Sequence, residues 1–133
     1  MSEENVEVVR RFIDAINRRN ADDWAAVVAP ELEFQSLFVG IEGRTYRGPE
    51  SGRRYFGDLA DAWDSFHVEI EDSVDLGGDR VLTSARYQGR GKASRAETEA
   101  HIWAVNVVRD GKVVSARTYL NRDAALEAAG LRE

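Results

Sequence analysis

His101 is the side chain of this sequence that is best suited to proton transfer. The unperturbed pKa of histidine is about 6.5, so His101 can act as a general acid or base at neutral pH. Glu97 and Glu99 precede it at alternate positions, which places all three on one face of a strand. Alternate residues on a strand lie roughly 7 Å apart, too far for a direct hydrogen bond. A metal site would need a further ligand such as His67, and no metal is expected.

The alternative for His101 is a structural role. A partly buried or interfacial histidine with an ordinary hydrogen-bond partner is more common than a catalytic one. Tyr55, Tyr87 and Tyr119 could donate hydrogen bonds into a pocket, although tyrosines in sheets are usually core residues with a solvated hydroxyl. Both interpretations of His101 therefore remain open.

The composition excludes several classes of function. The 133 residues carry a formal net charge of -6 and no cysteine. Nucleic-acid binding needs a clustered excess of Lys and Arg, so no nucleic-acid partner is expected. Without cysteine there is no disulfide, thiolate nucleophile or cysteine metal site. The sequence has no signal-peptide pattern and no stretch of membrane-spanning length, so we expect a cytoplasmic protein with no membrane contact and no cofactor.

The elements that position these side chains follow from the hydrophobic pattern. Apolar residues at helical spacing predict a first helix over residues 3–19 and a short second helix over 21–29. Alternation over residues 31–37 predicts a strand. The Gly48-Pro49 pair precedes a third helix, because proline suits the first helical position.

The second half of the chain changes to alternating periodicity, which predicts a sheet. Antiparallel strands are expected over residues 66–70, 81–87, 100–108 and 113–120. The last two are joined by Asp110-Gly111, a pair that tolerates the positive φ of a tight hairpin turn. A short helix over residues 122–129 follows, with Asn121 as its N-cap.

The order of helices and strands predicts a single α+β domain over residues 1–133. The N-terminal helices can cover one face of a strongly curved antiparallel sheet and form a cone with apolar walls. We therefore expect a pocket inside the cone. Both faces of the last two strands are fairly apolar, so we also expect a homodimer through the convex face of the sheet.

One register of the last hairpin places His101 inside the cone. If Asp110-Gly111 is a two-residue turn, Trp103 lies opposite Thr118. The concave face then carries His101, Trp103, Val105, Ala116 and Thr118.

A second register places His101 outside the cone. If Arg109 joins the turn and Gly111 forms a bulge, the pairing slips by one residue. Ile102 and Ala104 then take the inner face. We favour the first register, because it buries the bulkier apolar side chains.

Four stretches of the chain carry a family resemblance. They are Asn5-Val-Glu-Val-Val-Arg-Arg-Phe12, Tyr46-Arg-Gly48, His101-Ile-Trp103 leading to Arg109-Asp-Gly-Lys-Val113, and Tyr119-Leu-Asn-Arg122 through Ala125-Leu-Glu-Ala-Ala-Gly-Leu131. In these stretches the chain resembles the SnoaL-like branch of the nuclear transport factor 2-like superfamily, which implies the cystatin-like cone. Members include ketosteroid isomerases, polyketide cyclases and limonene epoxide hydrolase, alongside non-catalytic binding proteins. The fold alone therefore assigns no reaction.

The acid and base residues of the ketosteroid isomerases and of the SnoaL-type cyclases have no match in this chain. By resemblance, the ketosteroid isomerase positions fall near Phe12, near Phe34 or Gln35, and near Trp103 or Ala104. None of these side chains suits the proton transfer or enolate binding that the reaction needs. On the final strand, Thr118 stands where SnoaL-type cyclases carry an aspartate. A threonine hydroxyl can orient a substrate but is a poor general acid or base.

The leading hypothesis is a small-molecule-binding protein with an aromatic, mostly neutral pocket for an apolar ligand. The expected pocket residues are Phe12, Ile16, Trp24, Phe34, Gln35, Tyr55, Phe56, Leu59, Trp63, Tyr87, Trp103, Val105, Ala116, Thr118 and Leu120. One alternative is an isomerase, cyclase or hydrolase that uses His101 as its acid or base. Another is a dimeric interaction module without a ligand, which a pocket filled by its own side chains would favour.

Overall fold

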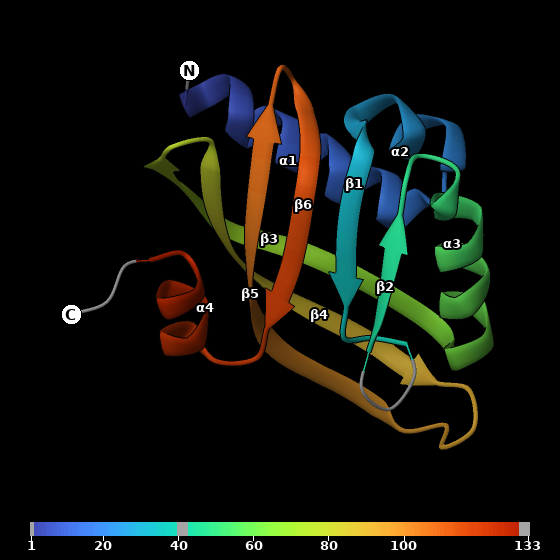
Figure 1. Cartoon of the computed structure of the whole chain (residues 1–133). Helices are drawn as coiled ribbons and strands as arrows, with labels where there is room; N and C mark the ends of the chain where they lie inside the picture. Colours follow the sequence, from blue (N-terminus) through green and yellow to red (C-terminus); the bar gives the residue numbers. More distant parts are fainter. Residues whose placement is uncertain (1, 40–42, 131–133) are drawn as a thin grey trace.

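A six-stranded sheet with helices packed against it forms this structure, a computed structural model that describes residues 2–39 and 43–130 (Figure 1). The helices are α1 (Ser2–Arg18), α2 (Ala21–Val27), α3 (Ser51–Ala62) and α4 (Arg122–Ala128). The strands are β1 (Val28–Ser36), β2 (Arg44–Arg47), β3 (Trp63–Gly77), β4 (Arg80–Gly91), β5 (Glu97–Arg109) and β6 (Lys112–Tyr119). The predicted α+β class is confirmed.

The sheet is mixed, whereas the sequence predicted a purely antiparallel one. The strand order is β2-β1-β6-β5-β4-β3, and β1 pairs with β6 in parallel. All other neighbours are antiparallel. β1 can pair with β6 in parallel because parallel neighbours need a long connection, and α3 and the strands β3 to β5 lie between them in the chain. The sequence did not predict β2, since Tyr46 is its single buried residue.

The sheet is strongly bent, and α1 lies in the bend. Figure 1 shows β3 and β4 crossing behind β1 and β6, and α1 packs against β3, β4, β5 and β6. Val9, Phe12 and Ile16 on the apolar stripe of α1 are buried in this contact. We call the face of the sheet that α1 covers the inner face.

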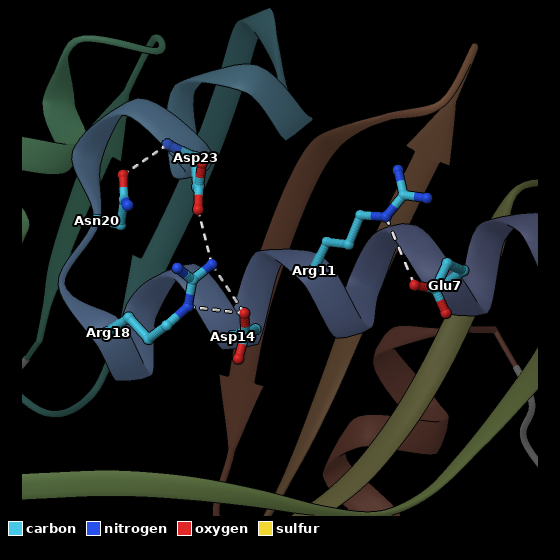
Figure 2. Close-up of polar contacts among 6 residues, drawn as sticks. All are labelled: Glu7, Arg11, Asp14, Arg18, Asn20 and Asp23. Carbon is cyan, nitrogen blue, oxygen red and sulfur yellow. Dashed lines mark hydrogen bonds and ion pairs between the residues drawn. The ribbon is translucent and has the colours of Figure 1, made fainter.

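Charged side chains occupy the solvent side of α1 and tie it to α2 (Figure 2). Arg18 contacts Asp14 one turn earlier at 2.9 Å and Asp23 of α2 at 2.7 Å. The side chain of Asn20 accepts a hydrogen bond from the backbone nitrogen of Asp23 and caps α2. These contacts join the end of α1 to the first turn of α2, whose Trp24 is buried in the core.

Gly52 at the start of α3 makes room for Trp24. A Cβ atom at Gly52 would lie 2.7 Å from Cε3 of Trp24, closer than real Cβ contacts allow. The indole is fully buried and packs against the rings of Phe12 and Phe56, at centroid distances of 5.9 and 6.3 Å. It therefore has no open space into which it can move.

We expect Gly52→Ala to lower the free energy of unfolding by about 1–3 kcal/mol, because the added methyl overpacks the core. The matched control is Gly57→Ala on the same helix, where nothing lies within 4 Å of the new methyl. In this control the free energy of unfolding should rise by about 0.5–1 kcal/mol, because alanine has a higher helix propensity than glycine. Urea denaturation of both variants measures the difference, and equal effects would contradict the packing of α3 on Trp24.

The hairpin between β5 and β6 contains a bulge that decides which residues face inward. Asp110 and Gly111 form the predicted two-residue turn, with φ values of 55° and 75°. The pairing then shifts between Val107 and Val108, so that Val107 pairs with Ser115 and Val114 has no partner on β5. The favoured register was wrong: Thr118 lies opposite Ala104, not opposite Trp103.

Candidate ligand-binding cavity

A cavity of about 50 Å³ lies on the inner face of the sheet, under α1 and α3. Side chains from both helices, from all strands except β2 and from the segment after β1 enclose it. They are Phe12, Ile13, Ile16, Phe34, Phe38, Tyr55, Val68, Thr83, Ala85, Ile102, Ala104, Asn106, Ala116 and Thr118. The cone predicted from the sequence thus encloses only a small space, because large apolar side chains fill most of it.

Small residues on neighbouring strands leave this space open. Ala85, Ala104 and Ala116 belong to β4, β5 and β6, and each has only a methyl group facing α1. The rings and branched side chains of Phe12 and Ile16 stand above them without filling the hollow completely. The cavity therefore exists because three adjacent strands carry alanine where a core strand usually carries a larger residue.

Polar groups stand among the alanines. Thr83 and Thr118 flank Ala104 on the adjacent strands, and Asn106 follows Ala104 on the same face of β5. Thr83 shares a hydrogen bond of 3.3 Å with Ser73. Asn106 is 2% exposed, and its Nδ2 has no hydrogen-bond partner in the described part of the chain. A buried donor without an acceptor is rare in folded proteins, and in the described chain Nε1 of Trp24 and Nε of Arg86 also lack one.

A buried pair of hydroxyls lies at the α3 side of the cavity. Ser36 Oγ and Tyr55 Oη are 3.1 Å apart, and the backbone nitrogen of Phe38 donates to the same Oγ at 3.2 Å. Burial raises the pKa of Tyr55 to about 12, and the Ser36 hydrogen bond opposes this shift only in part. The hydroxyl of Tyr55 is therefore protonated and uncharged at neutral pH.

The cavity is electrically neutral. Among residues 2–39 and 43–130, no Asp, Glu, Lys, Arg or His lines it. Its chemistry therefore consists of apolar contacts and of hydrogen bonds from an amide and from hydroxyl groups.

Several of the residues predicted for the pocket line this cavity. They are Phe12, Ile16, Phe34, Tyr55, Ala116 and Thr118. Trp24, Phe56 and Leu59 are buried in the core behind it. Trp63 and Tyr87 pack beside it: Nε1 of Trp63 donates to the carbonyl of Phe38, and the rings of Phe38 and Tyr87 are 4.9 Å apart.

The other predicted residues point away from the cavity. Trp103 and Val105 occupy the outer face of β5, because the bulge at Val114 reverses the expected pairing. Gln35 pairs with Arg117 on the outer side of β1 and β6, and Leu120 is 63% exposed.

His101 also lies on the outer face, away from the cavity. Its side chain is 59% exposed, and its Nδ1 is 3.0 Å from a carboxylate oxygen of Glu71. Glu97 and Glu99 do not contact it but form ion pairs with Arg90 and Arg86. The histidine therefore has an ordinary surface partner, and it cannot touch a molecule bound between α1 and the sheet.

The most informative cavity residue, Asn106, was not predicted from the sequence. It stands in the apolar run Ala104-Val-Asn-Val-Val108, where asparagine is unusual because strands disfavour it. A polar residue inside such a run is the signal that could have found it. Thr83 and Ala104 were missed because nothing local distinguishes them from ordinary strand residues.

A bent sheet that encloses a small apolar cavity under N-terminal helices defines a class of cone-shaped α+β proteins. The family model for the SnoaL-like domain matches residues 9–116, so this chain belongs to the SnoaL-like domain family. This finding confirms the resemblance that the sequence motifs predicted. A search of curated proteins finds no significant match.

Solved structures share the fold along nearly the whole chain. A Catenulispora acidiphila protein with a ketosteroid isomerase-like fold, in complex with trimethylamine, is 20% identical over 95% of this chain and 94% of that one, with a TM-score of 0.75. A nuclear transport factor 2-like protein from Burkholderia xenovorans is 25% identical over 97% of both chains, with a TM-score of 0.71. An epoxide hydrolase from M. tuberculosis is 17% identical over 95% of this chain and 89% of that one, with a TM-score of 0.69.

Proposed function

We propose that this protein binds a compact small molecule in the cavity between α1 and strands β4, β5 and β6. The observation that carries the proposal is an unfilled, mostly apolar cavity inside the core, lined also by the polar side chains of Thr83, Asn106 and Thr118. Unfilled space in a core loses packing contacts, and a buried polar group is costly unless it is hydrogen-bonded. A bound molecule of matching size and polarity would supply both kinds of contact.

The volume of the cavity limits the size of this molecule. The cavity measures about 50 Å³. An engineered cavity of about 150 Å³ takes up benzene, and most drug-sized ligands need about 300–1,000 Å³. A ligand of only a few heavy atoms therefore fits, and a polycyclic one does not unless lining side chains such as Phe38 move.

The family supports a ligand-binding role without defining the ligand. The related structure from Catenulispora acidiphila holds trimethylamine, a molecule of four heavy atoms. Even the best very small ligands have a binding free energy of only about -1.5 kcal/mol per heavy atom. A ligand of four heavy atoms therefore binds no more tightly than a Kd of tens of micromolar. We expect millimolar affinity for simple probes.

The chemistry of the cavity favours binding over acid–base catalysis. Tyr55 is the titratable side chain among the described lining residues, and its pKa of about 12 makes it a poor proton acceptor or donor at neutral pH. Catalysis by His101, the alternative suggested by the sequence, would require a substrate on the outer face of the sheet. On that face the side chain of His101 is 59% exposed and pairs with Glu71.

Filling the cavity should abolish binding. Ala104→Val adds two carbons on the inner face of β5, where a β-branched residue suits the strand. Titration with acetone and isobutene, followed by NMR, should shift the backbone amides of Ala85, Ala104 and Ala116 in the natural protein. In Ala104→Val these shifts should fall at least about tenfold, because the space is occupied.

His101→Ala is the matched control for this titration, because it lies on the opposite face of the same strand. It should bind both probes as the natural protein does. If the probes shift amides near Trp103 on the outer face and leave the inner face unchanged, the proposed binding site is wrong.

A further inference from the structure

β3 is the last strand of the sheet, so one side of its backbone has no neighbouring strand (Figure 1). Side chains from the end of α1 cover the first half of this edge. The amide of Asn17 donates to the carbonyl of Val68 at 2.8 Å and accepts from the nitrogen of Val68 at 2.9 Å. Nη2 of Arg19 donates to the carbonyl of Phe66 at 3.0 Å. Asn17 therefore makes the pair of hydrogen bonds that a further strand would make at this position.

The second half of the same edge is open. Val68 turns its backbone groups away from β4, and Ile70 does the same two residues later. β3 has an extra residue at Glu71, whereas β4 pairs with β5 without a shift. The regular alternation of β4 therefore turns the backbone groups of Ser73 and Asp75 to the open side as well. Among the described residues, no strand or side chain hydrogen-bonds to these outward-facing backbone groups.

A groove runs along this open edge, between β3 and α1. Two hollows of about 490 and 750 Å³ share Val6, Arg10 and Ser73 and together form the groove. It follows α1 from Asn17 to Glu3, a distance of about 21 Å at about 1.5 Å per residue. An extended segment of about six residues has this length.

The groove combines apolar and acidic side chains. Val6, Ile13 and Ile70 are partly buried along it. Its carboxylates outnumber its basic side chains, which are Arg10 and His67 among the described lining residues. The carboxylates belong to Glu3, Glu7, Asp14, Glu69 and Asp75. An extended segment with lysine or arginine at alternate positions complements this charge.

We propose that the open half of β3 binds an extended segment of a protein partner, rich in lysine or arginine, as an added strand. Backbone hydrogen bonds to Ile70 and Ser73 supply affinity, and the charge of the groove selects the basic segment. A second copy of β3 fits less well, because pairing would bring Glu69, Glu71 and Asp72 of two copies together. This surface is separate from the cavity and does not depend on a molecule bound there.

A capped hexapeptide that alternates valine and lysine tests this surface in NMR titrations of the full chain. The backbone amide protons of Ile70 and Ser73 should move downfield and exchange more slowly, because they gain acceptors. The same peptide with glutamate in place of lysine should bind at least about tenfold more weakly. Two lysine peptides, methylated on one or the other set of alternate backbone nitrogens, should differ at least about tenfold, because an edge pairs with one side of an added strand.

Paired variants of the chain test the charge of the groove. Glu7→Gln combined with Glu69→Gln removes two ion-paired carboxylates from it and should weaken binding of the lysine peptide about three- to tenfold. The matched control combines Glu33→Gln with Glu97→Gln, which removes two ion-paired carboxylates from β1 and β5, away from the groove. This control should bind the peptide as the natural protein does.

Four results would overturn the proposal. The first is no binding of the lysine peptide at about 1 mM. The second is equal binding of the two methylated peptides, because the contact is then not strand pairing. The third is equal binding of the glutamate peptide, or an equal loss in both pairs of variants. The fourth is a dimer in light scattering that dissociates as the peptide binds, which identifies a second copy as the occupant.

Discussion

Replacing Trp24 by alanine should lower the free energy of unfolding by about 3–5 kcal/mol. The indole is fully buried and lies between Phe12 of α1 and Phe56 of α3. Its Nε1 has no hydrogen-bond partner in the described chain, so the loss comes from packing alone. An empty space of this size cannot collapse, because α1 and α3 are also fixed by the sheet.

Trp103→Ala is the matched control for this experiment, since the same side chain is removed from the outer face of β5. Trp103 is only half-buried and contacts His101 at a ring distance of 6.4 Å. We expect a loss of about 1 kcal/mol. Chemical denaturation of both variants measures the two losses. If Trp103→Ala costs as much as Trp24→Ala in a sample that is monomeric by light scattering, the assignment of Trp103 to the outer face is wrong.

Raising the pH from 10 to 12 should cost the protein about 2 kcal/mol of folding free energy through Tyr55 alone. Burial raises the pKa of this tyrosine from 10.0 to about 12, so the folded state holds its proton where the unfolded state releases it. The contribution is complete below pH 10 and is lost as the pH rises through 12. Tyr46 adds to the loss, because burial and its hydrogen bond to Asp58 also raise its pKa.

Tyr55→Phe removes the titrating hydroxyl and should make the loss of stability above pH 10 clearly smaller. At neutral pH this variant should lose about 1 kcal/mol, because the hydrogen bond with Ser36 is gone. Tyr119→Phe, at the end of β6 on the outer face, should keep the alkaline loss of the natural protein. Denaturation curves from pH 8 to 12 compare the three chains, and parallel curves would show that Tyr55 is not responsible.

Some expectations from the sequence stay predictions. The homodimer through the convex face is one, and Trp103, Val105 and Tyr119 give that face a partly exposed apolar strip. The single domain over residues 1–133 and the cytoplasmic location are others. Among the described residues, no helix combines the length and the apolar character that crossing a bilayer requires.

Features that depend on neighbouring residues could be predicted from the sequence. The spacing of Val9, Phe12 and Ile16 determined α1, and Asn121 caps α4 as expected by accepting a hydrogen bond from the backbone nitrogen of Ala124. Asp110-Gly111 determined the turn. The order of helices and strands predicted the cone, the family motifs implied the same shape, and the aromatic residues Phe12, Phe34 and Tyr55 were expected in its wall. Helix periodicity, caps and turns are local, so the sequence alone decides them.

The tertiary structure decided which side chains the cavity contains. Both faces of β5 are apolar, so Trp103 and Val105 competed with Ile102 and Ala104 for the inner face, and hydrophobic bulk favoured the wrong pair. A single unpaired residue in β6, Val114, reversed this choice, because side chains alternate between the faces of a strand. The same reversal placed His101 outside the cavity and Asn106 inside it. A bulge depends on how two strands fit together across the sheet, and no property of Val114 itself announces it.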